Sequence, residues 1–348
     1  MHQRHDPPRE VEVHPKAEFA NSCKMRCRES DTGLSNVLNM GKRAVLLFAG
    51  QGAQTVGMGR DLAETFSCVR ELFAQADAQL GYSLSSIMFE GPASELTRTS
   101  ICQPALYLHG MACLALLKSQ APDLEIVGCA GLSLGEFTAH AAAGTFSFAT
   151  GLDLVAKRGT FMEEATSATA GSMAALIGGE ESDIRDLAAK CDVDVANLNC
   201  PGQIVLSGKK EGIACVLAEA QNFGVRIAQE LDVAGAYHSR LMMSAQEKLA
   251  AVLADLTLET PSLPVVCNVE AREVSQADDI RRTLEAQVSG SVRWSDCVQH
   301  FIGKGEDLVI ELGPGRVLAG MMRRIDRNVK ALSFSDVESF AKVLEELA

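Results

Sequence analysis

The stretch Glu125-Ile-Val-Gly-Cys-Ala-Gly-Leu-Ser-Leu-Gly135 decides how this sequence folds. Its first six residues are mostly apolar and predict a buried strand, and the alanine-rich segment after Gly135 predicts a helix. The glycines around Ser133 match the pattern Gly-x-Ser-x-Gly, in which a sharp strand-to-helix turn exposes the serine hydroxyl as a nucleophile. The alternative is a structural serine at the start of a helix. The strand before it and the helix after it favour the nucleophile.

Similar signals alternate along most of the chain. Arg43–Gly50 predicts a buried strand that runs into a loop, and helices are expected around 61–80 and 103–119. This alternation indicates an α/β fold with a mainly parallel sheet, of the α/β-hydrolase-like kind. Toward the C-terminus we expect a helix over 239–253, a strand over 264–269, a helix near 277–289, a strand over 307–311 and a last helix after Leu312-Gly-Pro-Gly315.

Residues 171–233 show a different order of elements. Strands are expected over 172–178, 193–199, 203–207 and 225–231, with helices over 181–190 and 211–222. The order β-α-β-β-α-β is the ferredoxin-like pattern. We therefore expect a small inserted ferredoxin-like domain at 171–233 and a large α/β domain formed by 43–170 and 234–348. The cleft between two such domains is a common place for a substrate site.

Residues 1–42 differ from the rest, because they hold three of the seven histidines, two adjacent prolines and no apolar periodicity. We expect a disordered extension there, with an organelle leader as an alternative that the residues do not establish.

The amino-acid composition indicates a globular protein and argues against several other classes of protein. The chain has 348 residues, of which 47% are hydrophobic and 22% charged, as in ordinary globular proteins. The net charge of −13 argues against nonspecific nucleic-acid binding. No apolar run approaches the roughly 20 residues that cross a bilayer. The eleven cysteines form no Cys-x-x-Cys pair, so no metal site is predicted, and mostly free thiols in a reducing compartment are expected.

A serine nucleophile needs a base, and four histidines lie outside the extension: His109, His140, His238 and His300. His140 follows Ser133 on the same predicted helix, about 10 Å along it, so we expect it to be packed or exposed. His109 lies in an apolar helix and His300 near the tail. His238 lies in a loop after a predicted strand, a position suited to catalysis. The residues alone favour His238 modestly.

Seven motifs occur in one order and together resemble the malonyl-CoA:acyl-carrier-protein transacylases of type II fatty-acid synthesis. The resemblance covers about 44–340. Leu132 before the serine and Ala234-Gly-Ala-Tyr-His238 resemble plant and algal plastid members more than typical bacterial ones, and Ala49 replaces a proline that is common in the first motif. The motifs are Phe48-Ala-Gly-Gln-Gly-Ala-Gln54, Gly131-Leu-Ser-Leu-Gly-Glu136, Lys157-Arg-Gly159, Asn199-Cys-Pro-Gly-Gln203, Ala236-Tyr-His-Ser239, Gln287 with Val292-Arg-Trp294, and Glu311-Leu-Gly-Pro-Gly315.

The resemblance implies catalytic roles for four residues. Ser133 is the nucleophile that carries the acyl group as an ester, and His238 is the general base and then the general acid. The backbone amides of Gln51 and Leu134 form the oxyanion hole. No triad aspartate is evident, so a carbonyl or amide oxygen is expected to orient the histidine.

The resemblance also implies substrate-binding roles. Arg158 holds the malonyl carboxylate in a bidentate pair, with a surface salt bridge as the alternative. Gln287 orients the site, with an exposed helix residue as the alternative. Tyr237 crowds an α-methyl branch and so favours malonyl over methylmalonyl, with a core tyrosine as the alternative. Asn199 belongs with these residues through its motif.

The expected activity is transfer of malonyl from malonyl-CoA to the phosphopantetheine thiol of acyl carrier protein, by a ping-pong mechanism and without a cofactor. We expect a monomer that binds neither nucleic acid nor membrane. The resemblance favours a plastid location, with the cytoplasm or the mitochondrion as alternatives. Three other functions stay open: a serine esterase of the α/β-hydrolase type, a non-catalytic docking protein, and a stand-alone polyketide acyltransferase.

Overall fold

A computed structural model of the chain describes residues 41–348. The extension expected over 1–42 lies outside the described residues, apart from its last two. The larger of two sheets has the strand order β10-β9-β1-β2-β7-β8, and every pairing in it is parallel except that of β7 with β8. The prediction of an α/β fold with a mainly parallel sheet is confirmed. Its strands are β1 (Arg43–Phe48), β2 (Glu125–Gly131), β7 (Val265–Val266), β8 (Glu273–Val274), β9 (Leu308–Leu312) and β10 (Lys330–Phe334).

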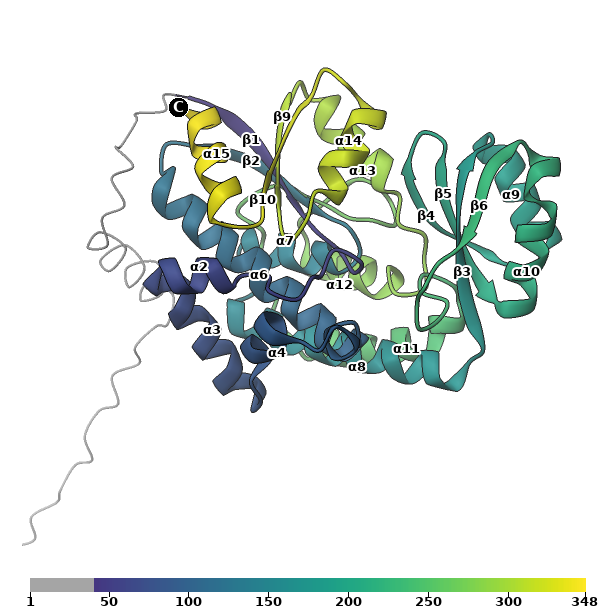
Figure 1. Cartoon of the computed structure of the whole chain (residues 1–348), viewed down its shortest axis with the longest axis horizontal. Helices are drawn as coiled ribbons and strands as arrows, with labels where there is room; N and C mark the ends of the chain where they lie inside the picture. The colour runs from purple at the N-terminus through teal and green to yellow at the C-terminus, as the bar shows by residue number, and fades with distance from the viewer. Residues whose placement is uncertain (1–40) are drawn as a thin grey trace, which may run out of the picture.

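Helices cover both faces of this sheet, and the central strand β1 is therefore buried on both sides. Leu46 and Phe48 point into one hydrophobic core, while Val45 and Leu47 point into the other. The first core is formed largely by α6 (Thr99–Gln120), α7 (Leu134–Ala142), α8 (Phe148–Ala168) and α11 (Met243–Ala254), and the second by α13 (Trp294–Ile302) and α14 (Val317–Ile325) (Figure 1). Continuous apolar runs such as β1 are typical of strands with both faces covered.

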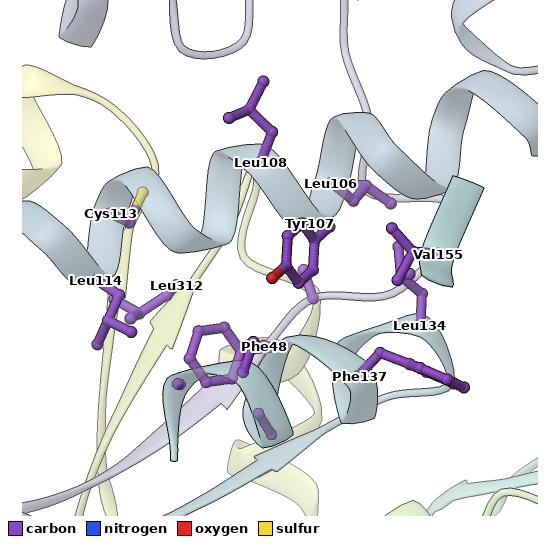
Figure 2. Packing of buried hydrophobic residues seen from close by; sticks show 14 of the residues in the cluster. Phe48, Leu106, Tyr107, Leu108, Cys113, Leu114, Leu134, Phe137, Val155 and Leu312 are labelled. Atoms are coloured by element: carbon purple, nitrogen blue, oxygen red, sulfur yellow. The ribbon is translucent and has the colours of Figure 1, made fainter. Parts of the chain in front are cut away.

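The first core fixes the ends of the strands that lead to the site. Figure 2 shows the Phe48 ring, at the end of β1, near Tyr107 of α6 and near Phe137 of α7. The ring lies against Gly110 of α6, where an added Cβ atom would come within 3.3 Å of it. The Tyr107 hydroxyl donates to the Phe148 carbonyl at 3.0 Å, which ties α6 to α8. The loop after β1 therefore starts from a tightly packed position.

One described helix, α6, is long and apolar enough to cross a membrane, although no such run was expected from the sequence. In the fold, 83% of the apolar 18-residue stretch of this helix is buried inside the protein. The hydrophobic length of α6 is explained by its central place in the first core.

The second sheet is antiparallel, with the strand order β4-β5-β3-β6. It lies at one end of the molecule, and two helices pack on it around an apolar core of its own (Figure 1). Its elements follow the chain in the order β-α-β-β-α-β: β3 (Gly171–Gly178), α9 (Glu181–Lys190), β4 (Asp194–Cys200), β5 (Gln203–Lys209), α10 (Lys210–Glu219) and β6 (Val225–Glu230).

Some element boundaries differ from the expected ones. The helix expected over 61–80 is two helices, because the backbone is extended at Phe66 between them. The strand expected over 264–269 is only two residues long, and β10 was not predicted, because three of its five residues are only half-buried at the sheet edge. The other helices are α2 (Arg60–Thr65), α3 (Ser67–Leu80), α4 (Leu84–Glu90), α5 (Ala93–Leu96), α12 (Ala277–Ala286) and α15 (Val337–Leu347).

The cysteines are mostly free thiols among the described residues, but one pair is not. Cys191, at the end of α9, and Cys215, in α10, form a disulfide with a Cα–Cα distance of 5.6 Å. Sequence spacing did not predict this bond, because 24 residues separate the two positions and only the packing of α9 beside α10 brings them together.

Candidate active site

Ser133 occupies a sharp turn between β2 and α7. Its backbone has φ 55° and ψ −106°, and its side chain caps no helix N–H. A Cβ atom on Gly131 would come within 1.9 Å of the Gly135 carbonyl carbon, and one on Gly135 within 2.1 Å of the Phe48 carbonyl oxygen. Only glycine fits at either position, so the spacing Gly-x-Ser-x-Gly follows from the close approach of three backbone segments.

His238 faces the serine. Its Nε2 lies 2.8 Å from Ser133 Oγ, and its Nδ1 lies 2.8 Å from the Gln287 carbonyl oxygen and 3.2 Å from that of Gly290. Carbonyl oxygens only accept hydrogen bonds, so Nδ1 carries the hydrogen and Nε2 is free to accept from the hydroxyl. Backbone oxygens therefore orient the imidazole, where a triad would use a carboxylate.

Burial, together with the smaller effect of the nearby Arg158 charge, lowers the pKa of His238 to about 4. The imidazole is consequently neutral at physiological pH. A neutral imidazole that accepts a hydrogen bond from a hydroxyl is able to take its proton.

The three other described histidines lie elsewhere. His140 is fully buried, with Nδ1 3.0 Å from Thr145 Oγ1, and His109 is buried in the first core. His300 lies 3.0 Å from a Glu273 carboxylate oxygen. None of them contacts Ser133, which leaves His238 as the histidine in reach of the hydroxyl among residues 41–348.

Arg158, on α8, is 1% exposed and points at the same hydroxyl. Its Nη2 donates to Ser133 Oγ at 3.1 Å and to Gln287 Oε1 at 2.8 Å, while Nη1 donates to Gln103 Oε1 at 2.8 Å. Burial lowers the pKa of Arg158 to about 10, so it stays charged. Within residues 41–348 it forms no ion pair with a carboxylate, so the surface salt bridge is excluded and a buried cation is left for an anionic ligand.

Gln287, the residue that follows α12, is fully buried, which excludes an exposed helix residue. Its Nε2 donates to the Ser133 carbonyl at 2.9 Å and to Glu136 Oε2 at 2.6 Å. Together with its contacts to Arg158 and His238, these bonds place Gln287 at the centre of the site.

Three further residues were not predicted for the site: Gln103, which accepts from Arg158, and Glu136 and Asn268, which lie around the serine turn. Asn268 Oδ1 accepts from the Ser133 backbone N–H at 2.7 Å, and its Nδ2 donates to the Gly131 carbonyl at 2.8 Å. Its own N–H donates to Glu136 Oε2 at 3.0 Å. Glu136 is a charged residue in an otherwise largely apolar segment after Ser133, and this signal could have identified it. Nothing local marked Asn268.

The two N–H groups expected to form the oxyanion hole belong to the loop after β1 and to the start of α7. A Cβ on Gly50 would come within 2.4 Å of the Leu132 carbonyl oxygen, so the loop that carries Gln51 lies directly against the serine turn. Leu134 is the first residue of α7, where an N–H has no acceptor within the helix. Among the described residues, the N–H groups of Gln51 and Leu134 both lack an acceptor.

Tyr237 lies beside this network, close enough to interact with the Arg158 charge, whereas no hydrogen bond between described residues links Asn199 to it. The Tyr237 hydroxyl lies 2.6 Å from Thr99 Oγ1, and its ring packs in the first core directly before His238. Asn199, on β4, is buried, and its Oδ1 has no partner among the described residues. Within 41–348 it forms no hydrogen bond with Ser133, His238 or Arg158. No group of three or more His, Cys, Asp or Glu side chains in this range is placed to hold a metal ion.

Known proteins share this arrangement of sequence and fold. The acyl transferase domain family matches residues 45–340. The malonyl-CoA–acyl carrier protein transacylase of Bacillus subtilis is 38% identical over 312 residues, which cover 88% of this chain and 97% of that protein.

Two solved structures are similar as well. The corresponding transacylase of Coxiella burnetii has a TM-score of 0.85 at 32% identity, covering 89% of this chain and 99% of that one. A malonyl-transacylase in complex with a type II polyketide-synthase acyl carrier protein has a TM-score of 0.84 at 34% identity, covering 88% and 100%. The chain therefore belongs to the malonyl-CoA–acyl carrier protein transacylase family.

Proposed function

We propose that this protein transfers malonyl from malonyl-CoA to the phosphopantetheine thiol of acyl carrier protein, through a malonyl ester on Ser133. One observation carries the proposal: the same hydroxyl is contacted by a neutral base, His238, and by a buried cation without a carboxylate partner, Arg158. A nucleophile, a base and an anion-binding group within one hydrogen-bonded cluster suit acyl transfer from a charged acyl donor.

In the first half-reaction, His238 Nε2 accepts the hydroxyl proton as Ser133 Oγ attacks the thioester carbonyl. The N–H groups of Gln51 and Leu134 stabilise the resulting oxyanion. The coenzyme A sulfur then leaves with the proton from His238, and the ester stays on Ser133. In the second half-reaction the carrier thiol gives its proton to His238 and attacks the ester, which releases malonyl-carrier protein and restores the serine.

Arg158 is proposed to bind the malonyl carboxylate in a bidentate pair. The planar guanidinium supplies two parallel N–H bonds, which an ammonium does not. Its present partners are amide and hydroxyl oxygens, all neutral, so a carboxylate that enters the site is the better acceptor. An acetyl group leaves this buried charge without a counter-ion, which favours malonyl.

Tyr237 and Asn199 are proposed to shape the substrate site. The hydrogen bond between the Tyr237 hydroxyl and Thr99 holds the Tyr237 ring in place next to His238. In that position the ring would crowd an α-methyl branch on the substrate. Asn199 carries a buried amide oxygen without a partner among the described residues, and an unpaired buried polar atom is a candidate for contact with substrate.

We further propose that 171–233 form a ferredoxin-like domain inserted into a large domain built from 43–170 and 234–348. The element order and the strand order β4-β5-β3-β6 support it. A plastid-type protein and a plastid location are proposed on the motif variants at Leu132 and Ala234–His238. Imaging of the full chain fused to a fluorescent reporter in plant cells tests the location, and signal confined to the cytoplasm would contradict it.

A stand-alone polyketide acyltransferase is the second candidate, since one structurally similar transacylase was solved with a polyketide carrier protein. Transfer rates to fatty-acid and polyketide carrier proteins, measured side by side, distinguish the two assignments.

Mass spectrometry after mixing with malonyl-CoA tests the proposed function. We expect one malonyl adduct, located on Ser133, that disappears when holo carrier protein is added. Ser133→Ala should form no adduct, while Ser207→Ala, which removes a buried hydroxyl from the second sheet, should label like the wild type. Hydrolysis of malonyl-CoA at equal rates with and without carrier protein would support an esterase instead.

A further inference from the structure

Glu136 is a buried carboxylate in contact with the residues that hold the serine. It is fully buried, and its Oε2 accepts two hydrogen bonds, from Gln287 Nε2 at 2.6 Å and from the Asn268 N–H at 3.0 Å. Its other oxygen, Oε1, is buried without a hydrogen-bond partner among the described residues. Neither oxygen contacts Ser133, His238 or Arg158 directly.

The two residues that donate to Glu136 contact Ser133, His238 and Arg158 between them. Gln287 contacts Arg158 through its side-chain oxygen, His238 through its backbone oxygen, and the Ser133 carbonyl through its nitrogen. Asn268 accepts from the Ser133 N–H. The positive φ of Ser133 is a strained conformation for serine, and it persists only where neighbours hold the backbone on both sides. Gln287 and Asn268 are those neighbours.

Glu136, the Ser133 carbonyl and Arg158 together fix which way the Gln287 amide points. Glu136 Oε2 and the Ser133 carbonyl only accept hydrogen bonds, so the amide nitrogen of Gln287 must face them. Its oxygen must then face Arg158. Were the amide reversed, its nitrogen would meet the guanidinium, donor against donor. Glu136 and Arg158 thus lie on opposite sides of one amide, and Arg158 has no direct carboxylate partner among the described residues.

We propose that Glu136 is a positioning residue that orients Gln287 and, through its charge, sets how strongly Arg158 binds the malonyl carboxylate. This inference rests on the proposed function. An ionised Glu136 offsets the Arg158 charge and opposes a second carboxylate, whereas a neutral Glu136 leaves Arg158 free to bind it. Protonation at Oε1, which has no donor facing it among the described residues, preserves both hydrogen bonds to Oε2 and therefore the orientation of Gln287.

The charge of Glu136 changes within the physiological range of pH. Burial raises its pKa to about 7, against the opposing effects of Gln287, Asn268 and Arg158. The other titratable groups that interact with it are the thiols of Cys267 and Cys297, whose pKa values burial raises, and both stay neutral between pH 6 and 8. Arg158 stays charged and His238 stays neutral over the same interval. Glu136 is the group of this set that titrates there.

The test compares two variants of Glu136 in acylation by malonyl-CoA and acetyl-CoA between pH 6 and 8. In the wild type, we expect the ratio of kcat/KM for malonyl over acetyl to fall severalfold as the pH rises and Glu136 ionises. Glu136→Gln keeps an acceptor oxygen without the charge, so it should keep kcat within about threefold, lower the KM for malonyl-CoA and give a ratio that does not vary with pH. Glu136→Met removes the acceptor, so kcat should fall at least tenfold for both substrates.

Glu311→Gln is the matched control. Glu311 is also fully buried, but it accepts hydrogen bonds from the Leu318 and Ala319 N–H groups at the start of α14, away from the serine. It should keep the pH dependence of the wild type. A Glu136→Gln ratio that still falls with pH, or a Glu136→Met variant with wild-type kcat, overturns the inference. If Glu136→Met does not fold, Glu136→Gln decides alone. Failure of the proposed function is a separate result, because then the wild type itself forms no malonyl ester.

Discussion

The two sheets of this protein differ in what their strand ends hold. In the large sheet, the parallel strands β1, β2 and β7 are followed by Gln51, Ser133 and Asn268, and all three positions lie at the same edge. The small sheet is antiparallel, so its strand ends alternate in direction, and its interior is an apolar core. Parallel strands bring polar residues together at one edge, whereas an antiparallel sheet does not.

The small sheet nevertheless supports the segment that contacts His238. Strand β4 is hydrogen-bonded to Val292, through the Val292 N–H to Ala196 at 2.8 Å and the Leu198 N–H to Val292 at 2.9 Å. Val292 follows Gly290 closely, whose carbonyl accepts from His238. The comparison suggests that the large sheet positions Ser133 and the residues that hold its turn, and that the small sheet fixes the segment that orients the histidine. Four experiments test this division.

Loss of the base should have the largest effect. His238→Ala should slow both half-reactions by roughly 10²–10⁴, because no other group in reach takes the serine proton. His140→Ala, seven residues after the serine but hydrogen-bonded to Thr145, should leave turnover nearly unchanged. Rapid-quench measurement of malonyl-enzyme formation provides the rates. The opposite order of the two variants would show that the base is misassigned.

Arg158→Ala should have the second-largest effect on activity. Malonyl transfer should fall by roughly 10²–10³, the scale of a lost buried charge pair. Acetyl transfer should stay level or rise, because acetyl leaves the arginine unpaired in the wild type. Arg158→Lys should recover only part of the loss. Steady-state kinetics with both thioesters check this, and a strong malonyl preference in Arg158→Ala would require another cation.

The pH dependence of acetyl transfer should show a smaller effect. Acetyl carries no carboxylate, so its acylation rate reports His238, whose pKa burial lowers to about 4. The imidazole must be neutral to act as a base, so the rate should stay level down to about pH 5 and fall below it. A histidine with an ordinary pKa near 6.5 would lose about tenfold between pH 7.5 and 5.5. Rates in buffers of constant ionic strength decide between the two profiles.

Removing the Cys191–Cys215 disulfide should affect activity least. The double change Cys191→Ser with Cys215→Ser releases a loop closed over 24 residues, which costs about 3 kcal/mol of stability. The thermal midpoint should fall by roughly 5 °C while kcat stays at the wild-type level. Calorimetry measures the thermal midpoint, and a transfer assay at 25 °C measures kcat. A large loss of kcat without unfolding would show that the small sheet does more than support the histidine.

Much of the fold and part of the site could be predicted from local patterns. The strand β2, the turn at Ser133 and the six elements of 171–233 follow from apolar runs, glycine spacing and helix periodicity, all of which act over a few residues. Two features of the structure were not predicted. The helix over 61–80 is interrupted at Phe66, and the disulfide joins residues whose proximity depends on how α9 packs beside α10.

The sequence by itself determined the nucleophile turn, because glycine at 131 and 135 is the only residue small enough for that backbone. With the resemblance it also selected His238, Arg158 and Gln287. Only the tertiary structure decided how these residues meet. Glu136 and Asn268 enter the site because α7, the segment after β7 and the end of α12 pack together, and each buried polar group must then find a partner. Such pairing spans more than 130 residues of chain, a separation that no local pattern encodes.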